Sequence, residues 1–169
     1  MTRRLVLLCC LVLFAGAAQT QTWKKSTNTT DGFEVEFSGD VETAQTEMTA
    51  EAAKRGVRAT NYTQTGSSFV YMVNVTTVRG VVNFSEAVKR SFQAVNCKST
   101  VSDTALPFPA GQARELRGTE CHDGTARAEA RYFTTGRRFY QALFLIKNDG
   151  GDLHAARRFL ESFSVIADE

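Results

Sequence analysis

A cysteine, a histidine and an aspartate stand side by side at Cys121-His122-Asp123, within the stretch RGTECHDGTARAEARYF. Such residues can act as a nucleophile with its base, as metal ligands, or simply mark the end of a strand. A cysteine nucleophile needs a histidine within hydrogen-bond reach and surroundings that lower the pKa of its thiol. Neighbours on a strand point to opposite faces, so His122 is poorly placed to activate Cys121. The other histidine, His154, falls at the expected exposed start of the last helix.

Other catalytic sites fit the sequence no better. A zinc site would have to use Cys97, Cys121, His122 and His154, and these residues lack the paired ligand spacing of zinc modules. The sequence contains no nucleophile-elbow serine, phosphate loop or dinucleotide fingerprint. Glu34 and Glu36 would stand about 7 Å apart on one strand face, as in some glycosidases, but a solvated face gives this pattern more often. We therefore predict that the protein is not an enzyme and has no catalytic residues, metal site or cofactor.

The first 20 residues have the layout of a secretory signal peptide. Two arginines precede an apolar run, and small-residue cleavage sites follow it: Arg3-Arg4, Leu5 to Phe14, Ala15-Gly16-Ala17 and Gly16-Ala17-Ala18. The apolar run is too short to span a bilayer as a permanent helix. We expect cleavage between about residues 17 and 22. Residues 21–169 would then form a single domain of a secreted or periplasmic protein with no transmembrane segment.

Cleavage changes both the charge and the cysteine count. The precursor has 20 Lys and Arg and 18 Asp and Glu, so loss of Arg3 and Arg4 leaves 18 of each. A formal charge of zero gives no reason to expect nucleic acid as a partner. The cysteines that remain, Cys97 and Cys121, are expected to form a disulfide in an oxidising compartment. Its loop of 25 residues is worth about 3 kcal/mol in the chain-entropy model.

Charged residues are unevenly distributed along the chain. Asp31 to Glu51 holds seven acidic residues and no basic one, whereas Lys54 to Arg158 holds 16 basic and eight acidic residues. An acidic edge facing a basic sheet explains this distribution, and so does an anion-binding face. The candidate residues of such a face are Arg114, Arg117, Arg127, Arg131, Arg137 and Arg138. In the alternative interpretation, Glu115 and Glu129 pair with these arginines across strands.

Hydrophobic periodicity places these side chains on an α+β fold. Alternating polar and apolar residues predict strands at Phe33 to Phe37, Val57 to Thr65, Gln112 to Arg117 and Thr125 to Phe133. Two further segments are apolar on both faces and therefore predict central strands, at Phe69 to Val78 and Arg138 to Lys147. Trp23 to Thr30 fits a linker or an edge strand, and Glu42 to Ala50 a further strand. Helices are predicted at Asn83 to Val95 and after Asp152, with these two polar residues as N-caps. We expect a mostly antiparallel sheet of about six to eight strands, two main helices and one disulfide.

Four stretches resemble a group of exported bacterial proteins without an assigned activity: DGFEVEFSGDVE, FPAGQARELRG, RRFYQALFLI and RRFLESFSV. That group is similar in pattern to the PsbP-like fold of photosystem II extrinsic subunits and Ran-binding Mog proteins. The resemblance covers most of residues 31 to 166 and consists of core patterns, so it implies a fold and no binding residue. The chain departs from the pattern at Ser38, where proline is expected, and at Ala110-Gly111-Gln112, where Pro-Gly is usual.

The leading functional hypothesis is a non-catalytic binding or accessory module for a protein or an anionic ligand. A hydrolase with an unrecognised site is one alternative, and a carrier of a small apolar ligand, suggested by 12 phenylalanines, is another. Converging carboxylates or histidines in a pocket would favour the enzyme, a large apolar cavity the carrier, and clustered arginines the binding module. Four asparagines lie in N-x-S/T sequons, which in a eukaryotic source would predict a glycoprotein: Asn28, Asn61, Asn74 and Asn83.

Mass spectrometry of the exported protein without reductant should show a chain that starts near residues 18 to 22 and weighs two hydrogens less than its reduced form. Both features follow from export into an oxidising compartment. Two free thiols in the exported protein would contradict the predicted disulfide.

Overall fold

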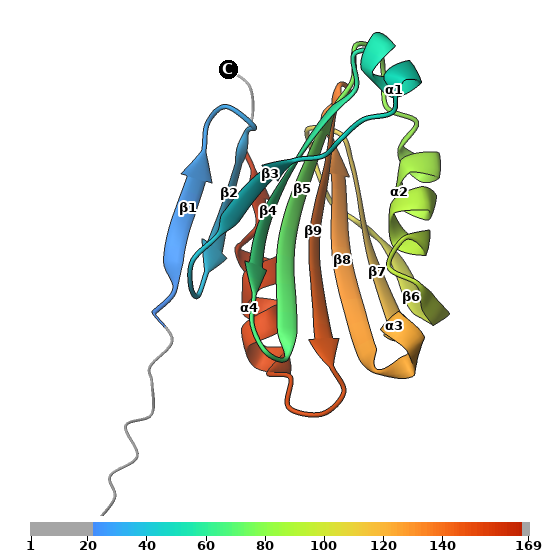
Figure 1. The fold of residues 1–169 in the computed structure, drawn as a ribbon. Coiled ribbons are helices and arrows are strands. Elements are labelled where there is room, and N and C mark those ends of the chain that lie inside the picture. The colour runs from blue at the N-terminus through green and yellow to red at the C-terminus, as the bar shows by residue number, and fades with distance from the viewer. Residues whose placement is uncertain (1–21, 167–169) are drawn as a thin grey trace, which may run out of the picture.

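A seven-stranded antiparallel sheet forms the centre of the computed structural model, which describes residues 22–166 (Figure 1). Its strands lie in the order β3-β4-β5-β9-β8-β7-β6. Their bounds are Glu42–Gln45 (β3), Arg58–Thr65 (β4), Phe69–Thr77 (β5), Cys97–Leu106 (β6), Gln112–Glu120 (β7), Ala126–Thr134 (β8) and Arg138–Lys147 (β9). Most neighbours in the sheet are also neighbours in the chain, as is usual for antiparallel strands joined by short turns.

A separate three-stranded sheet packs against the large one. It has the order β1-β2-β10, with bounds Lys24–Asn28, Phe33–Phe37 and Ser164–Val165. The helices are α1 (Ala50–Lys54), α2 (Phe84–Gln93), α3 (Cys121–Gly124) and α4 (Leu153–Ser162). The small sheet and α4 lie on one side of the large sheet, which we call the α4 face, and α2 lies on the other, the α2 face (Figure 1).

The core on the α4 face consists largely of aromatic side chains from the two sheets and α4. Phe159 of α4 is fully buried at its centre, where its ring centroid lies 5.0 Å from that of Tyr71 on β5 and 5.4 Å from that of Phe37 on β2. Phe163, just after α4, packs on Phe33 of the small sheet at 6.0 Å. Because these rings come from all three layers, they join the small sheet, α4 and the large sheet into one core.

The second core lies between α2 and strands β7, β8 and β9. The apolar stripe of α2, which includes Phe92, packs on alanine side chains of β8. The disulfide between Cys97 and Cys121 joins the start of β6 to α3 beside this core. A Cβ atom at Gly118 of β7 would lie 2.7 Å from the sulfur of Cys97 and 2.9 Å from the ring of Phe92, so only glycine fits there. The predicted disulfide is confirmed and packs directly on the sheet.

The α+β class, the number of strands in the sheet and the two main helices are confirmed. The side chain of Asn83 caps α2 by accepting a hydrogen bond from the Glu86 amide at 3.2 Å, and Asp152 caps α4 in the same way. The strand predicted from Glu42 to Ala50 ends at Gln45, because the chain there leaves the sheet toward α1. Within residues 22–166, no helix combines the length and the apolar character needed to cross a membrane.

Replacing Phe159 by alanine should lower the free energy of unfolding by about 4 kcal/mol, because the change leaves a cavity among the aromatic rings of the α4 face. Glu161→Ala, on the exposed side of the same helix, should change it by less than about 0.5 kcal/mol. Urea unfolding followed by circular dichroism measures both values. Similar losses in the two variants would contradict the assignment of Phe159 to the core.

Candidate functional site

The structure does not bring together the six arginines predicted as one anion-binding face. Arg117, Arg127 and Arg131 point to the α4 face of β7 and β8. Arg114 lies on the α2 face, where its Nε atom is 2.6 Å from Oδ1 of Asp103. The remaining two, Arg137 and Arg138, lie where β8 turns into β9. Whether any of them binds an anion stays a prediction.

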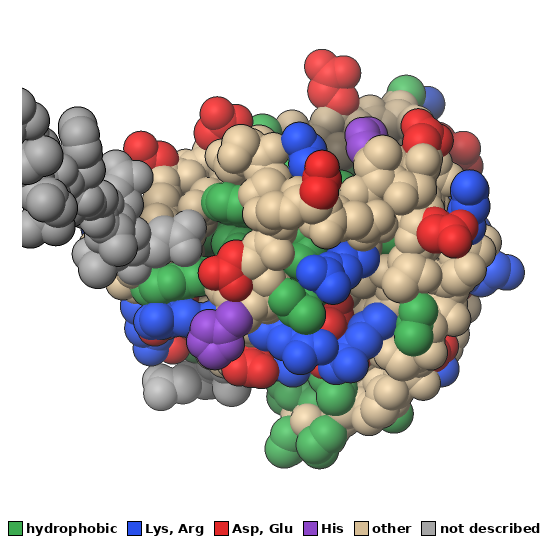
Figure 2. Space-filling model, turned by 90° about the horizontal axis from the view of Figure 1, so that it is seen from below, with side chains coloured by type: hydrophobic (Ala, Val, Ile, Leu, Met, Phe, Trp, Pro, Cys, Tyr) green, Lys and Arg blue, Asp and Glu red, His purple; other side chains and the backbone are tan. Residues whose placement is uncertain are grey.

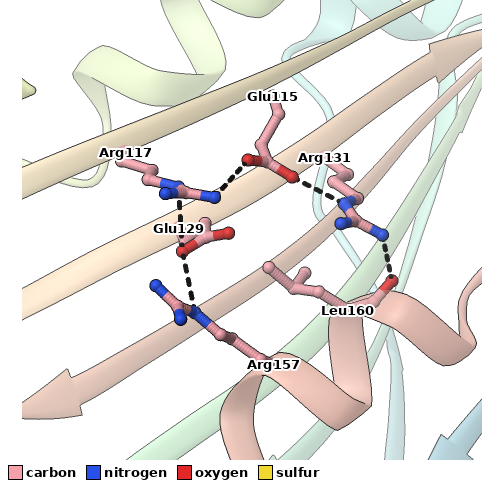
Figure 3. A network of polar contacts seen from close by, with 6 residues as sticks. All are labelled: Glu115, Arg117, Glu129, Arg131, Arg157 and Leu160. Atoms are coloured by element: carbon pink, nitrogen blue, oxygen red, sulfur yellow. Dashed lines mark hydrogen bonds and ion pairs between the residues drawn. The ribbon is translucent and has the colours of Figure 1, made fainter. Parts of the chain in front are cut away.

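An ion-pair network on the α4 face connects the large sheet to α4, and its members are Glu115, Arg117, Glu129, Arg131 and Arg157 (Figure 3). Arg131 Nε and Arg117 Nη2 each donate a hydrogen bond of 2.8 Å to Glu115. Glu129 Oε2 lies 3.2 Å from Arg117 Nε, which is an ion pair without hydrogen-bond geometry, and 4.0 Å from Arg157 Nε. Arg131 Nη1 also donates to the Leu160 carbonyl oxygen at 3.2 Å, which ties the sheet to the helix.

The balance between burial and neighbouring arginines differs at the two glutamates of the network. Glu115 and Glu129 are 8% and 5% exposed. Burial raises the pKa of Glu115, but the hydrogen bonds and charges of Arg131 and Arg117 outweigh it, so the pKa lies below its ordinary value. At Glu129 burial dominates and raises the pKa, although the charge of Arg117 opposes the shift. Glu115 is therefore the more firmly charged partner.

The ion-pair network acts mainly as a structural brace. The space between its side chains is about 150 Å³, below the roughly 300 Å³ at which ligand pockets begin. Figure 2, which shows the molecule from below, has Lys and Arg side chains gathered beside acidic ones. The pairing interpretation of Glu115 and Glu129 is thus confirmed. We did not predict Arg157 as a member of this group, because the prediction considered arginines on strands and turns only. Its position three residues before the inward-facing Leu160 indicates that it lies on the same side of α4.

A different group of arginines meets at the end of the sheet nearest α1. Arg58 of β4, Thr77 of β5 and Arg138 of β9 are direct partners in three neighbouring strands, so their side chains share the α4 face. Together with Arg79, which follows β5, they line a hollow of about 710 Å³ that we call the arginine hollow. Threonine hydroxyls in its wall, such as that of Thr60, add further hydrogen-bonding groups.

The arginine hollow has an excess of positive charge. Its wall contains three arginines and, among the described residues, one carboxylate, that of Asp31. Asp31 accepts a hydrogen bond of 2.5 Å from the Tyr62 hydroxyl, which occupies one of its oxygens. Arg58 and Arg79 are exposed, and neither has a carboxylate partner in residues 22–166. The excess positive charge of the arginine hollow therefore comes from Arg58 and Arg79.

Close packing fixes the position of Arg79. A Cβ atom at Gly56 would lie 2.4 Å from Arg79 Nε and 2.6 Å from its Cγ, so the arginine side chain lies directly on the Gly56 backbone. Gly56 also has a φ of 71°, a conformation that other residues rarely adopt. The segment that contains α1 and the segment after β5 therefore meet at Arg79, beside the arginine hollow.

An open groove of about 980 Å³ lies on the α2 face next to the arginine hollow, and we call it the α2 groove. It runs between α2, strands β4 and β5, and residues 78–82, and its wall is mostly apolar. Val81 stands in this wall with 86% of its surface exposed. The α2 groove and the arginine hollow share five wall residues, which are Thr46, Met48, Val57, Ala59 and Arg79.

The stretch Cys121-His122-Asp123 forms no reactive site. Cys121 is buried in the disulfide, and His122 and Asp123 are exposed in a turn where both have positive φ angles. Glu34 and Glu36 are engaged as well, because each forms an ion pair, with Lys25 at 2.6 Å and with Arg158 at 2.9 Å. Across residues 22–166 no three His, Cys, Asp or Glu side chains are grouped so that they could hold a metal ion.

The sequon asparagines all have structural roles. Asn61 and Asn74 are cross-strand partners joined by a hydrogen bond of 2.7 Å. Asn83 caps α2, and Asn28 donates to the Tyr62 hydroxyl at 2.7 Å. A glycan on Asn74 would be attached to the nitrogen that donates to Asn61, and a glycan on Asn61 to the nitrogen that donates to the Thr46 hydroxyl at 3.1 Å.

Comparisons with protein-family models, with curated proteins and with solved structures found no match. The resemblance to the PsbP-like fold therefore stays a prediction. The arginine hollow and the α2 groove have to be interpreted from their own geometry.

Glu115→Gln should lower the free energy of unfolding at pH 7 by about 3 kcal/mol, because it removes the charge that Arg131 and Arg117 bind. Folding lowers the pKa of Glu115, so its contribution is present above the ordinary value of 4.5 and is lost as the pH falls below it. The variant and the wild type should therefore converge in acid. Urea unfolding between about pH 3 and pH 7 measures the difference.

Glu129→Gln is the matched control for this experiment. Folding raises the pKa of Glu129, so its charged form is disfavoured in the native state and its neutral replacement should cost less at pH 7 than Glu115→Gln. The brace described above would be contradicted if Glu115→Gln lowered the free energy of unfolding equally at every pH. It would also be contradicted if Glu129→Gln lowered it more than Glu115→Gln at pH 7.

Proposed function

We propose that the protein is a non-catalytic binding module whose ligand carries a negative charge and is bound in the arginine hollow. The observation that supports this most is the register that places Arg58 and Arg138 on either side of Thr77, with Arg79 next to them. Guanidinium groups are always charged and present donors that match the oxygens of carboxylate, sulfate and phosphate. The hollow therefore has the charge and the donors that such a group needs.

The contrast with the ion-pair network supports this assignment. In the network, buried glutamates neutralise Arg117 and Arg131 within about 3 Å. In the arginine hollow, Arg58 and Arg79 are exposed and have no carboxylate partner within the described part of the chain. A charge that the fold does not neutralise remains available to a ligand.

The surroundings of the site favour binding over hydrolysis. The described walls of the arginine hollow and the α2 groove include neither histidine nor cysteine, and Asp31 is already engaged by Tyr62. A hydrolase would need an activated nucleophile with its base close to the bound substrate. The disulfide also supports a secreted or periplasmic location, since such bonds persist in oxidising compartments.

Arg58→Gln should weaken the binding of inorganic phosphate about tenfold, because it removes a charged hydrogen-bond donor from the arginine hollow. Titration of the mature, isotope-labelled protein, followed through its backbone amide NMR signals, measures the affinity and locates the ion. Lys147→Gln makes the same change of charge at the exposed far end of β9 and should leave binding unchanged.

Two results would contradict the proposed function. One is phosphate that shifts no signal near Arg58, Thr77 or Arg79 in a saturable way. The other is an equal loss of affinity in Arg58→Gln and Lys147→Gln, which would show a general effect of net charge rather than a site.

A further inference from the structure

The arginine hollow adjoins the α2 groove, and Arg79 belongs to the walls of both. A positively charged site and a mostly apolar groove thus lie next to each other around one end of the sheet. Resting on the proposed function, we infer that the ligand is an amphiphile with one anionic head group and one alkyl chain. Arg58 and Arg79 bind the head group, and the α2 groove takes the chain.

The polar side chains in the groove favour an alkyl chain over a peptide. Asn74 and Thr76 belong to the wall, but Asn74 Nδ2 donates to Asn61 at 2.7 Å and Thr76 Oγ1 donates to Asn74 Oδ1 at 3.0 Å. Strands β4 and β5 are each paired on both sides, so neither offers a free edge. The amide groups of a bound peptide would find few partners there, whereas an alkyl chain needs none.

The exposed lip of the groove supports the same ligand. Val81 is 86% exposed although it is a large hydrophobic residue, and its neighbours Val78 and Val82 also line the groove. An alkyl chain in the groove would cover part of this apolar surface and gain the corresponding transfer free energy. Arg55 and Arg90 also stand in the wall but are paired with Glu51 and Glu86, so Arg79 is the arginine of this wall that no carboxylate among residues 22–166 pairs with.

The test is isothermal titration of the mature protein with octanoate, decanoate and dodecanoate, each kept below its micelle concentration, and with decanol and inorganic phosphate. Because the groove is open on one side, we expect about half of the full transfer free energy, which tightens binding about fourfold for each two added methylene groups. Decanol, which lacks the charge, should bind at least tenfold more weakly than decanoate.

Two variants separate the head-group site from the chain site. Arg58→Gln should weaken the binding of all three carboxylates by the same factor and leave the increase in affinity per methylene group unchanged. Val81→Asp should reduce that gain, and Val101→Asp is its matched control, since Val101 is also exposed, at 64%, but lies on β6 outside the groove. Both valines are exposed, so neither change is expected to prevent folding.

The outcomes distinguish this inference from the proposed function. Carboxylates that bind with the same affinity at every chain length, while phosphate binds in the arginine hollow, would overturn the amphiphile and leave the anion site standing. If decanol binds as tightly as decanoate and Arg58→Gln does not weaken the binding of decanoate, both the amphiphile and the anion site are overturned. The protein would then be a carrier of apolar ligands. Binding only to vesicles of anionic phospholipid, with no binding of monomeric carboxylates, would also overturn the inference.

Discussion

Strand β9 is buried on both faces along almost its whole length. Most of the architecture follows from this, because each face of the strand needs a layer packed against it. On the α4 face, the cover is wide because the small sheet and α4 act together. On the α2 face, the cover is one main helix of ten residues. A helix is about 10 Å across and strands lie about 4.8 Å apart, so α2 can cover only two or three of the seven strands.

The limited cover on the α2 face explains where the groove lies. The core under α2 is built on β7, β8 and β9, so β4 and β5 remain open beyond it. The side chains on this open part are polar. Asn61, Asn74 and Thr76 form hydrogen bonds with one another there instead of packing against a layer above. The groove thus results from the geometry of the fold, and residues 78–82 add an apolar wall to it.

The same sheet uses its arginines in two different ways. Under α4, Arg117, Arg131 and Arg157 surround two buried glutamates, because charge brought beneath a helix must be paired. At the end nearest α1 there is no such cover, and Arg58 and Arg79 remain exposed without a carboxylate partner among the described residues. The proposed binding function depends on this difference in pairing and not on the number of arginines.

Periodicity and capping residues predicted the local structure well, because these signals act over a few neighbouring residues. Alternation placed Arg127 and Arg131 on one face and paired Glu115 and Glu129 with arginines, as the structure shows. The alternation also contained information about Arg114 and Arg117 that our prediction of one arginine face did not use. Arg114 and Arg117 are three residues apart, so they had to point to opposite faces of their strand.

The candidate site itself depends on pairings between distant segments, which the sequence alone does not reveal. Arg58 meets Arg138 only through the register of β4 with β5 and of β5 with β9. The first register follows from a tight turn, but the second joins strands about 70 residues apart and is set by tertiary packing. The same reason explains why β2 was recognised as a strand while its membership of a second sheet was not.

A crystal structure with bound ω-bromodecanoate is the most direct test of the central claim, because bromine and carboxylate mark the two ends of one ligand. Anomalous scattering should place the bromine in the α2 groove between α2 and β5, with the carboxylate beside Arg58 and Arg79. Bromine found beside the ion-pair network under α4, or a carboxylate that contacts no arginine, would contradict the account.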